Sequence, residues 1–595
     1  MRELKAILPY LARYRIRIVL GLATVVVSNF LVLGGLEFIR LGLDALETPG
    51  VTRAVIGRYA AASVGLALLA GVGRFWMREI LNGVSRLVET DLRDDFFAHV
   101  VRLDPSFHAV HPTGEIMSRA TTDLAAVRMV AGPAYMYLVN TIVFGILAIS
   151  RMLLLDPWMT VVSLAPLLLL PPVTIGFGNL IHDRFEKIQE QLGAVATMAQ
   201  ENLAGQRIVK AYGQEAAQAE RFRGASREAL RRNVELARTS GLFYPSLGFL
   251  AGLAVTLALW VGGRAAIVGR ISIGELVLFL LYLGMLAWPM IALGWVVNLF
   301  QRGAASMGRV SRVLDTRPRL DEAADAAAPE RVRGEIELRG VSFRYPGSER
   351  DVLREVSFHV PAGATVALVG ATGSGKSTLV SLLVRLWDPT DGEILLDGIP
   401  LPRWPLAALR EAVALVPQDT FLFSETLLEN LALGFDEPDD ALRLERVRAA
   451  ARVARLDDTI EGFPGGYETL LGERGINLSG GQKQRAALAR AVARDAPVLV
   501  LDDALSAVDT HTEHGILEGL RDVFAGRTSI IVSHRVTAVM HADQILVLDD
   551  GRVAERGTHA ELLRLGGVYA ALQRRQLLAE AVEGDDVLAG SGHGV

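Results

Sequence analysis

Long apolar runs dominate the first half of the chain, and polar segments separate them. A membrane helix needs about 20 apolar residues. Six runs reach that length, near residues 16–38, 54–81, 132–155, 157–180, 242–268 and 271–300. Arg58 and Arg74 interrupt the second run, and Pro166, Pro171 and Pro172 should kink the fourth. The pattern predicts an α-helical membrane domain over residues 1–315.

The polar segments between these runs alternate in length and in charge. Residues 82–130 and 181–241 are long, polar and helix-like, and they hold more Lys and Arg than the short connections do. Positive charge gathers on the cytoplasmic side of a membrane. We therefore expect a multi-pass protein of the cytoplasmic (inner) membrane, with both termini and both long segments in the cytoplasm.

From residue 334 onward, short apolar runs alternate with helix-like stretches. We expect strands at Glu335–Arg339, Val341–Tyr345, Thr365–Val369, Val498–Leu501 and Thr528–Val532. The alternation predicts an α/β domain with a largely parallel core sheet over residues 334–578. A polar linker over 316–333 precedes it, and the tail over 579–595 is expected to be disordered.

Composition narrows the chemistry. Hydrophobic residues make up 51% of the 595 positions, which is high for a soluble protein. The chain has no cysteine, so disulfides, thiol catalysis and cysteine-based metal sites are excluded. A net charge of −5 gives no general attraction to nucleic acid, and we expect no such partner.

One glycine-rich stretch carries the strongest chemical signal. Gly370-Ala-Thr-Gly-Ser-Gly-Lys-Ser377 fits the pattern GxxxxGK[ST] and follows the apolar run Thr365–Val369. In this pattern backbone N–H groups surround a polyphosphate, the lysine reaches the outer phosphates, and the final hydroxyl suits Mg²⁺. A helix is expected behind the loop, opened by Leu379–Leu386.

Two further stretches extend this signal. Val498–Leu501 is a buried strand that ends in Asp502, a carboxylate suited to Mg²⁺. Leu478-Ser-Gly-Gly-Gln482 precedes a helix expected over Lys483–Arg494, so it forms a second anion-binding helix N-terminus. Since the domain already has one phosphate loop, the second turn is expected to act on a nucleotide held across an interface.

Together these motifs resemble an ATP-binding-cassette (ABC) exporter half-transporter, and the resemblance covers nearly the whole length. It implies an ATPase coupled to transport, with ATP and Mg²⁺. The implied nucleotide-binding residues are Tyr345 (the aromatic that stacks on adenine), Gly370, Thr372, Gly373, Ser374, Gly375, Lys376, Ser377 and Thr378 of the Walker A loop, Ser479, Gly480, Gly481 and Gln482 of the signature, and Asp509 of the D-loop.

The resemblance also assigns chemical roles. The implied Mg²⁺ ligands are Ser377, Gln418 and Asp502, and the implied catalytic residues are Asp503, His534 and Gln418. In the family, two chains form two sites, and each site combines the Walker motifs of one chain with the signature of the other.

The residue after the Walker B aspartate departs from the family pattern. A fully active site has Glu there to polarise the attacking water, whereas this chain has Asp503. Asp is shorter by about 1.5 Å, and a misplacement of about 1 Å can cost about 10²-fold in rate. This pattern resembles the Asp-bearing half of heterodimeric multidrug exporters, whose own Walker site hydrolyses ATP slowly. The alternative is a homodimeric lipid or peptide exporter or flippase that uses Asp503 as a slower base.

The resemblance implies as partners the lipid bilayer and a second ABC half-transporter that carries the catalytic Glu. The spans show no strongly charged cavity signature, which favours amphipathic, membrane-soluble cargo. A peptide or lipid exporter stays the closest alternative within the class. A soluble ABC ATPase would need no apolar spans, and an ABC importer usually separates the membrane and ATPase chains.

Overall fold

The computed structural model describes residues 3–320, 322–323, 325–472, 475 and 477–577, apart from the side chain of Thr510. The expected disordered tail, 579–595, lies outside the described residues. These residues form two compact units. The first takes in the described parts of Met1–Leu103 and His111–Arg317, and the second those of Asp104–Val110 and Pro318–Val595.

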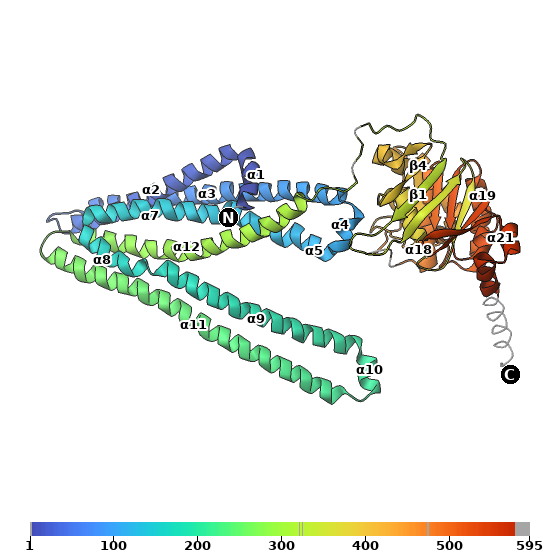
Figure 1. Ribbon diagram of the computed structural model, residues 1–595. Coiled ribbons are helices and arrows are strands. Elements are labelled where there is room, and N and C mark those ends of the chain that lie inside the picture. Colours follow the sequence, from blue (N-terminus) through green and yellow to red (C-terminus); the bar gives the residue numbers. More distant parts are fainter. Residues whose placement is uncertain (1–2, 321, 324, 473–474, 476, 578–595) are drawn as a thin grey trace. The chain divides into compact units, whose positions relative to one another are not determined.

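The first unit is a bundle of long helices (Figure 1). Six helical segments within the described residues are long and apolar enough to cross a membrane, so the predicted number of spans is confirmed. They are α2 (Arg15–Leu46), α3 (Arg53–Arg102), α5 to α7 (Thr113–Leu155), α8 and α9 (Pro157–Ala204), α11 (Glu215–Ile267) and α12 (Ile273–Leu314).

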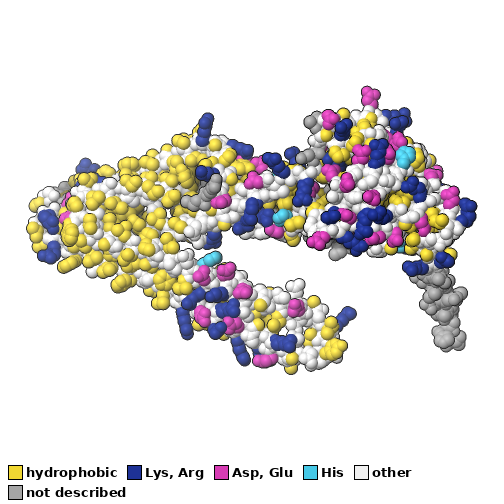
Figure 2. All heavy atoms as spheres, in the orientation of Figure 1, with side chains coloured by type: hydrophobic (Ala, Val, Ile, Leu, Met, Phe, Trp, Pro, Cys, Tyr) yellow, Lys and Arg dark blue, Asp and Glu magenta, His cyan; other side chains and the backbone are white. Residues whose placement is uncertain are grey.

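These helices are longer than a bilayer requires, because the polar segments continue them. The 53 residues of α11 span about 80 Å, against a hydrocarbon core of about 30 Å. Helices α9 (Leu170–Ala204) and α11 run side by side as an arm closed by α10 (Gln206–Ala211). Figure 2 shows apolar side chains covering the bundle and charged side chains on the far half of this arm.

The fourth span breaks where the prolines predict a kink. Helix α8 (Pro157–Leu167) contains Pro166, and α9 begins at Leu170 after a turn. Pro171 lies in the first turn of α9, where a missing N–H breaks no helical hydrogen bond. The third span also departs from a regular helix, with π turns η2 (Arg119–Asp123) and η3 (Val130–Ala134).

Polar contacts join three of the helices at one end of the bundle. Arg40 lies 2.8 Å from Glu37 and 3.2 Å from Asp44 on α2. Arg40 also lies 3.9 Å from Glu275 in the first turn of α12. Arg151 of α7 (Tyr135–Leu155) pairs with Glu37. We call these five residues the Arg40 cluster; its two arginines pair with three carboxylates within the protein.

The described residues of the second unit form two sheets. Their ten strands are β1 (Ile336–Phe343), β2 (Leu353–Val360), β3 (Thr365–Val369), β4 (Asp391–Leu396), β5 (Ile399–Pro400), β6 (Val413–Val416), β7 (Val498–Asp502), β8 (Thr528–Val532), β9 (Gln544–Asp549) and β10 (Arg552–Gly557). The larger sheet has the order β10-β9-β3-β8-β7-β6, and all neighbours are parallel except β10 and β9. The predicted fold class, six membrane helices joined to an α/β domain with a mainly parallel sheet, is confirmed.

Several expected elements have different bounds. The runs Glu335–Arg339 and Val341–Tyr345 form one strand, β1, whose pairing register shifts between Leu338 and Val341. That shift lets the chain continue as one strand where the apolar pattern changes phase. A second sheet, antiparallel and with the order β2-β1-β4-β5, was not among the expected elements.

Two helices begin earlier than expected. Helix α13 (Lys376–Leu383) and helix α18 (Gly480–Arg494) start within the glycine-rich motifs rather than after them. Each motif is therefore both a loop and the first turn of a helix, so unpaired N–H groups lie where an anion would bind.

Candidate nucleotide site

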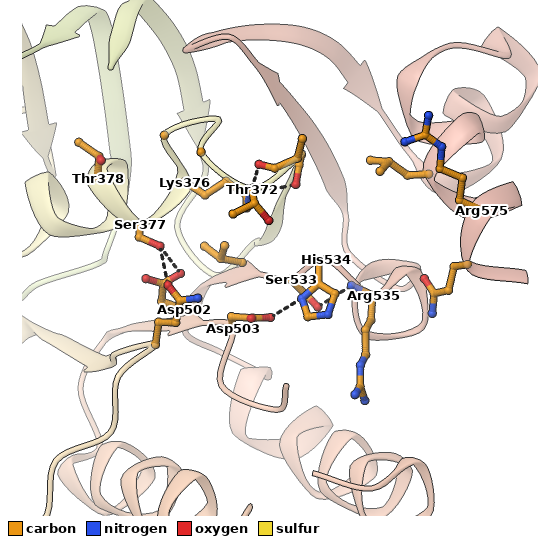
Figure 3. A pocket seen from close by; sticks show the side chains of 18 of the residues that line it. Thr372, Lys376, Ser377, Thr378, Asp502, Asp503, Ser533, His534, Arg535 and Arg575 are labelled. Atoms are coloured by element: carbon orange, nitrogen blue, oxygen red, sulfur yellow. Dashed lines mark hydrogen bonds and ion pairs between the residues drawn. The ribbon is translucent and has the colours of Figure 1, made fainter. Parts of the chain in front are cut away.

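The second unit has a cavity of about 850 Å³ at one edge of the parallel sheet. The loops after β3, β6, β7 and β8 line it, because the carboxyl ends of parallel strands meet at the same edge. Of the residues singled out from the sequence, the cavity gathers Gly370, Thr372, Gly373, Gly375, Lys376, Ser377, Thr378, Gln418, Asp502, Asp503 and His534 (Figure 3).

The loop Gly370–Ser377 requires glycine at two positions. A Cβ at Gly370 would lie 2.2 Å from the carbonyl oxygen of Leu548. Gly375, just before α13, has φ of 102°, a left-handed conformation that other residues rarely adopt. The loop therefore curls closely against the sheet, and its backbone is arranged before any ligand binds.

Lys376 lies inside this loop. Its Nζ donates hydrogen bonds to the carbonyl oxygens of Gly370 (2.9 Å) and Ala371 (2.8 Å), and it lies 3.3 Å from the hydroxyl of the buried Ser374. Burial lowers the pKa of Lys376, although the nearby carboxylates of Asp502 and Asp503 oppose this. The ammonium group is thus held in place by weak, neutral partners that a phosphate would outcompete.

Three oxygen-bearing side chains meet beside Lys376. The Ser377 hydroxyl lies 3.2 Å from Asp502 Oδ1 and 3.4 Å from Gln418 Oε1. Burial raises the pKa of the Asp502 carboxyl; Asp503 adds to the rise, and Ser377 and Lys376 oppose it. Hydroxyl, amide and carboxylate oxygens are the ligands that Mg²⁺ takes in proteins, so these residues fit the ion.

Asp503 has an unusual backbone conformation and a defined partner. Its φ is 50°, in the left-handed region where Asp is tolerated better than most residues. Its Oδ1 lies 2.9 Å from Nδ1 of His534, as the dashed line in Figure 3 shows. An ionised carboxylate only accepts hydrogen bonds, so His534 donates from Nδ1.

The segment after Asp503 connects the cavity to α18. The side chain of Gln484, on α18, donates to the Ser506 hydroxyl and accepts from the Ala507 N–H, both at 2.8 Å. Arg535, next to His534, donates to the Ser506 carbonyl at 3.2 Å and pairs with Glu513. A shift of this segment would therefore reach both the cavity and the start of α18.

The signature residues lie elsewhere in the unit. Ser479 caps α18: its hydroxyl accepts from the Gln482 N–H (3.3 Å), and Gln482 Oε1 accepts from the Ser479 N–H (2.8 Å). At Gly481 a Cβ would lie 2.8 Å from the Ala507 carbonyl, and Gly480 packs beside the same residue. None of the described residues Ser479–Gln482 belongs to the cavity lining.

Asp509 and Tyr345 also lie outside that lining. Asp509 caps α19 (Thr510–Phe524) by accepting from the Thr512 N–H at 3.0 Å. The Tyr345 hydroxyl lies 3.0 Å from the Thr378 hydroxyl, and its ring packs edge-on against Phe343 and Trp387. Tyr345 therefore borders the phosphate loop from the side of Thr378.

Sequence reasoning missed part of the lining. Arg535 and Thr537 follow His534 at the end of β8, and Leu572, Arg575 and Gln576 come from the last described helical turns of the chain. Gln576 accepts a hydrogen bond from the Val536 N–H at 2.9 Å, which holds those turns against the cavity. No motif marks these residues; only their spatial neighbourhood identifies them.

Comparisons with known proteins agree with this geometry. The family described as "ABC transporter transmembrane region" matches residues 18–290, and that described as "ABC transporter" matches residues 353–506. A structure titled "Structure of a bacterial Atm1-family ABC exporter with ATP bound" superimposes with a TM-score of 0.79. It is 30% identical to this chain and covers 95% of this chain and 99% of its own.

Curated relatives extend over almost the full length. "Probable multidrug resistance ABC transporter ATP-binding/permease protein YheI" of Bacillus subtilis (strain 168) is 36% identical, covering 97% of both chains. "Multidrug resistance-like ATP-binding protein MdlA" of Escherichia coli (strain K12) is 35% identical, covering 95% of both. The "ATP-dependent lipid A-core flippase" of Aromatoleum aromaticum is 37% identical, covering 87% of this chain and 84% of the flippase.

Proposed function

The chain belongs to the ABC transporter family, as a membrane-spanning exporter with a fused transporter ATPase, and on that premise we propose its cargo, its partner and the state of its own ATP site. The chain is one half of a dimer that exports amphipathic or hydrophobic compounds across the cytoplasmic membrane. The observation that carries the proposal is the shared cavity of Lys376, Ser377, Asp502 and His534 on a chain with six apolar spans.

ATP binding follows from the residues of that cavity. The N–H groups of the loop and the Lys376 ammonium attract the phosphates, and Ser377, Gln418 and Asp502 would hold Mg²⁺. When bound, the ion supplies positive charge that offsets the charge developing on the transferred phosphoryl group. In this proposal Gln418 also senses the membrane domain, and His534 contacts the outermost phosphate.

Asp503 makes hydrolysis at this chain's own Walker site slow. Its carboxylate already accepts from His534, and its side chain is one methylene shorter than the Glu of a fully active site. A base that is held back from the attacking water loses much of its effect, because proximity dominates such steps. ATP binding does not depend on that residue and is expected to persist.

A second chain is needed to complete each site. The signature turn Leu478–Gln482 has intact hydrogen bonding at the start of α18 but does not line this chain's own cavity. Ser479, Gly481 and the free N–H groups of α18 are suited to close on a phosphate held by a partner. Asp509 would lie at the interface between the two.

We favour a partner of different sequence that carries Glu after its Walker B aspartate. The signature of this chain would then complete the partner's Walker site, which hydrolyses ATP efficiently. The Walker site of this chain would mainly bind ATP. The rival is a homodimer that flips lipid or exports peptide with Asp503 as a slow base. The relatives named as multidrug transporters and as lipid A-core flippases are compatible with either cargo class.

ATP hydrolysis by the chain alone, compared with the chain co-purified with an adjacent half-transporter, tests this proposal. We expect low turnover alone and a large increase in the pair. Reconstituted vesicles should then take up an amphipathic dye against its gradient only with ATP. Rapid turnover by the chain alone, abolished by Asp503→Asn, would instead support the homodimer.

A further inference from the structure

The membrane unit contains a cavity of about 350 Å³ that is lined by residues of α2, α3, α7 and α12. We call it the membrane cavity; the residues that matter here are Asn29, Arg74, Arg78, Asn140, Met285 and Trp288, all in its lining. The four helices also contact one another in pairs, so the cavity belongs to one packed unit.

The charge in the membrane cavity has one sign. Arg74 and Arg78 are both exposed, and no Asp or Glu is among the described residues of the lining. No ion pair joins either arginine to another described residue, in contrast to Arg40. The two side chains stand one turn apart on the same face of α3, so they repel each other and favour an anion between them.

Their depth matches that of a headgroup. Residues 59–73 of α3 carry no charge, and Arg74 lies about 24 Å along the helix from Arg58. That distance approaches the thickness of the hydrocarbon core. The predicted orientation assigns this level to the cytoplasmic leaflet, where the anionic group of a membrane amphiphile would lie.

The rest of the lining suits the other parts of such a molecule. Asn29, only 4% exposed, donates to Asn140 Oδ1 at 3.1 Å, so a polar pair lies near the arginines. Met285 and the exposed ring of Trp288 give an apolar wall from α12. Methionine adapts to irregular shapes, which suits hydrocarbon chains of different length.

We propose that the membrane cavity binds the anionic headgroup of an amphiphile, with Arg74 and Arg78 holding its charge and Met285 and Trp288 contacting its hydrocarbon chain. The inference rests on the proposed export function and deepens it by naming a class of cargo, phosphate- or carboxylate-bearing amphiphiles. A planar guanidinium binds such groups through paired hydrogen bonds, and two of them favour an anion strongly over a cation.

Calorimetric titration of the full-length protein in a neutral detergent, without nucleotide, tests the proposal. The probes are dodecyl phosphate, dodecyltrimethylammonium and inorganic phosphate. We expect dodecyl phosphate to bind at least about tenfold more tightly than the cationic probe, and more weakly as salt increases. Equal affinity for the two dodecyl probes would overturn the proposal. Binding of inorganic phosphate as tight as that of dodecyl phosphate would overturn its assignment to an amphiphile.

Variants then assign the binding to the arginines. The double variant Arg74→Gln, Arg78→Gln should lose about tenfold in affinity for dodecyl phosphate, and Arg74→Lys, Arg78→Lys should recover part of it. Arg58→Gln, exposed on the same helix but outside the cavity, should bind as the wild type does. Unchanged affinity in the Gln double variant would refute the role of the pair. If that variant does not fold, the proposal is still decided by the wild type, through its preference between the two dodecyl probes and the salt dependence of its binding.

The outcome is independent of the proposed export. Headgroup binding is measured without ATP, whereas export is measured as ATP-driven uptake into vesicles. Binding without transport would defeat the export function and leave this site standing. Transport without preference for anionic amphiphiles would defeat the site and leave the export function standing.

Discussion

The cavity of about 850 Å³ around Lys376, called the nucleotide cavity from here on, and the membrane cavity both present positive charge, but their surroundings differ. In the nucleotide cavity Lys376 is enclosed by loop carbonyls, with Asp502 and Asp503 close by. In the membrane cavity Arg74 and Arg78 have no ion-pair partner among the described residues. We relate this difference to the two proposed functions. The lysine that would bind ATP is fixed by a loop at the end of a strand, whereas the two arginines of the membrane cavity would gain a counter-charge only while cargo is bound.

The same contrast separates what the two sites demand of their ligands. The loop around Lys376 fixes donors in one geometry, which suits a polyphosphate of constant shape. The methionines and exposed tryptophan of the membrane cavity impose little geometry. The comparison implies that single changes in the nucleotide cavity should have large effects and single changes in the membrane cavity small ones.

Removal of Lys376 gives the largest expected effect. Lys376→Ala deletes the only charged donor of the loop Gly370–Ser377, so binding of a fluorescent ATP analogue should weaken about 10²- to 10³-fold. Lys187→Ala, at an exposed position on α9, serves as the control and should bind normally. A loss under about tenfold would show that the backbone N–H groups alone hold the phosphates, and the contrast between the cavities would weaken.

Lengthening Asp503 should increase activity. We expect Asp503→Glu to raise ATP hydrolysis at this site by about tenfold to 10²-fold, because the carboxylate gains the reach it lacks. The measurement needs a pair in which the partner's Glu is changed to Gln, so that only this site turns over. Glu tolerates the left-handed backbone at this position less well than Asp, so a small drop in thermal stability should accompany the gain.

Asp503→Asn is the matched control for that experiment. It keeps the size of the side chain and removes the charge, so hydrolysis at this site should fall further while ATP binding persists. If the Glu variant is no faster than the wild type, reach is not what limits the site. The His534 contact would then be the better explanation.

Sequence alone located the nucleotide cavity because its chemistry depends on local patterns. The glycines of 370–375 and the strand ending at Asp502 are contiguous stretches whose geometry follows from short-range rules. Leu572, Arg575 and Gln576 could not be found in this way, since they reach the cavity only through the packing of the chain end. Likewise, the phase shift in β1 was read as two strands because pairing partners are not visible in sequence.

Few features of the sequence indicated the membrane cavity. The spans showed no strongly charged cavity signature, yet two arginines line the cavity. Arg74 stood out as an interruption of the apolar run over 54–81, whereas Arg78, near the end of the same run, was not singled out. Only the packing of four helices, far apart in the chain, brings Asn29 and Trp288 to the same place.

Paired and unpaired arginines within the membrane unit allow a direct test. Arg40→Gln leaves Glu37, Asp44 and Glu275 without their shared cation, so it should lower stability by about 2 kcal/mol. Arg74→Gln should change stability by less than about 0.5 kcal/mol, because it breaks no ion pair among the described residues. Thermal unfolding in detergent measures both, with exposed Arg53→Gln as control. Equal losses at positions 40 and 74 would mean that Arg74 has an internal partner, which would remove the distinction.

A smaller effect than that of Arg40→Gln is expected when the charge of the buried Asp502 is removed. Burial raises the pKa of the Asp502 carboxyl in the folded protein. The folded state therefore binds the proton more tightly than the unfolded state does. The stability that this proton contributes is complete below the ordinary Asp pKa of about 3.9 and is lost as the pH rises through the folded pKa. Asp502→Asn should therefore be more stable than the wild type by about 1 kcal/mol at neutral pH, without nucleotide and with a chelator present. The gain should shrink as the pH approaches 4, and Asp436→Asn, at an exposed site, should show no such trend. The same variant should lose the extra stability that ATP with Mg²⁺ gives the wild type, because a ligand of the ion is gone. If the difference in stability between Asp502→Asn and the wild type does not change with pH, burial of the Asp502 charge does not destabilise the nucleotide cavity. Only the membrane cavity would then contain charges that the protein leaves without compensation.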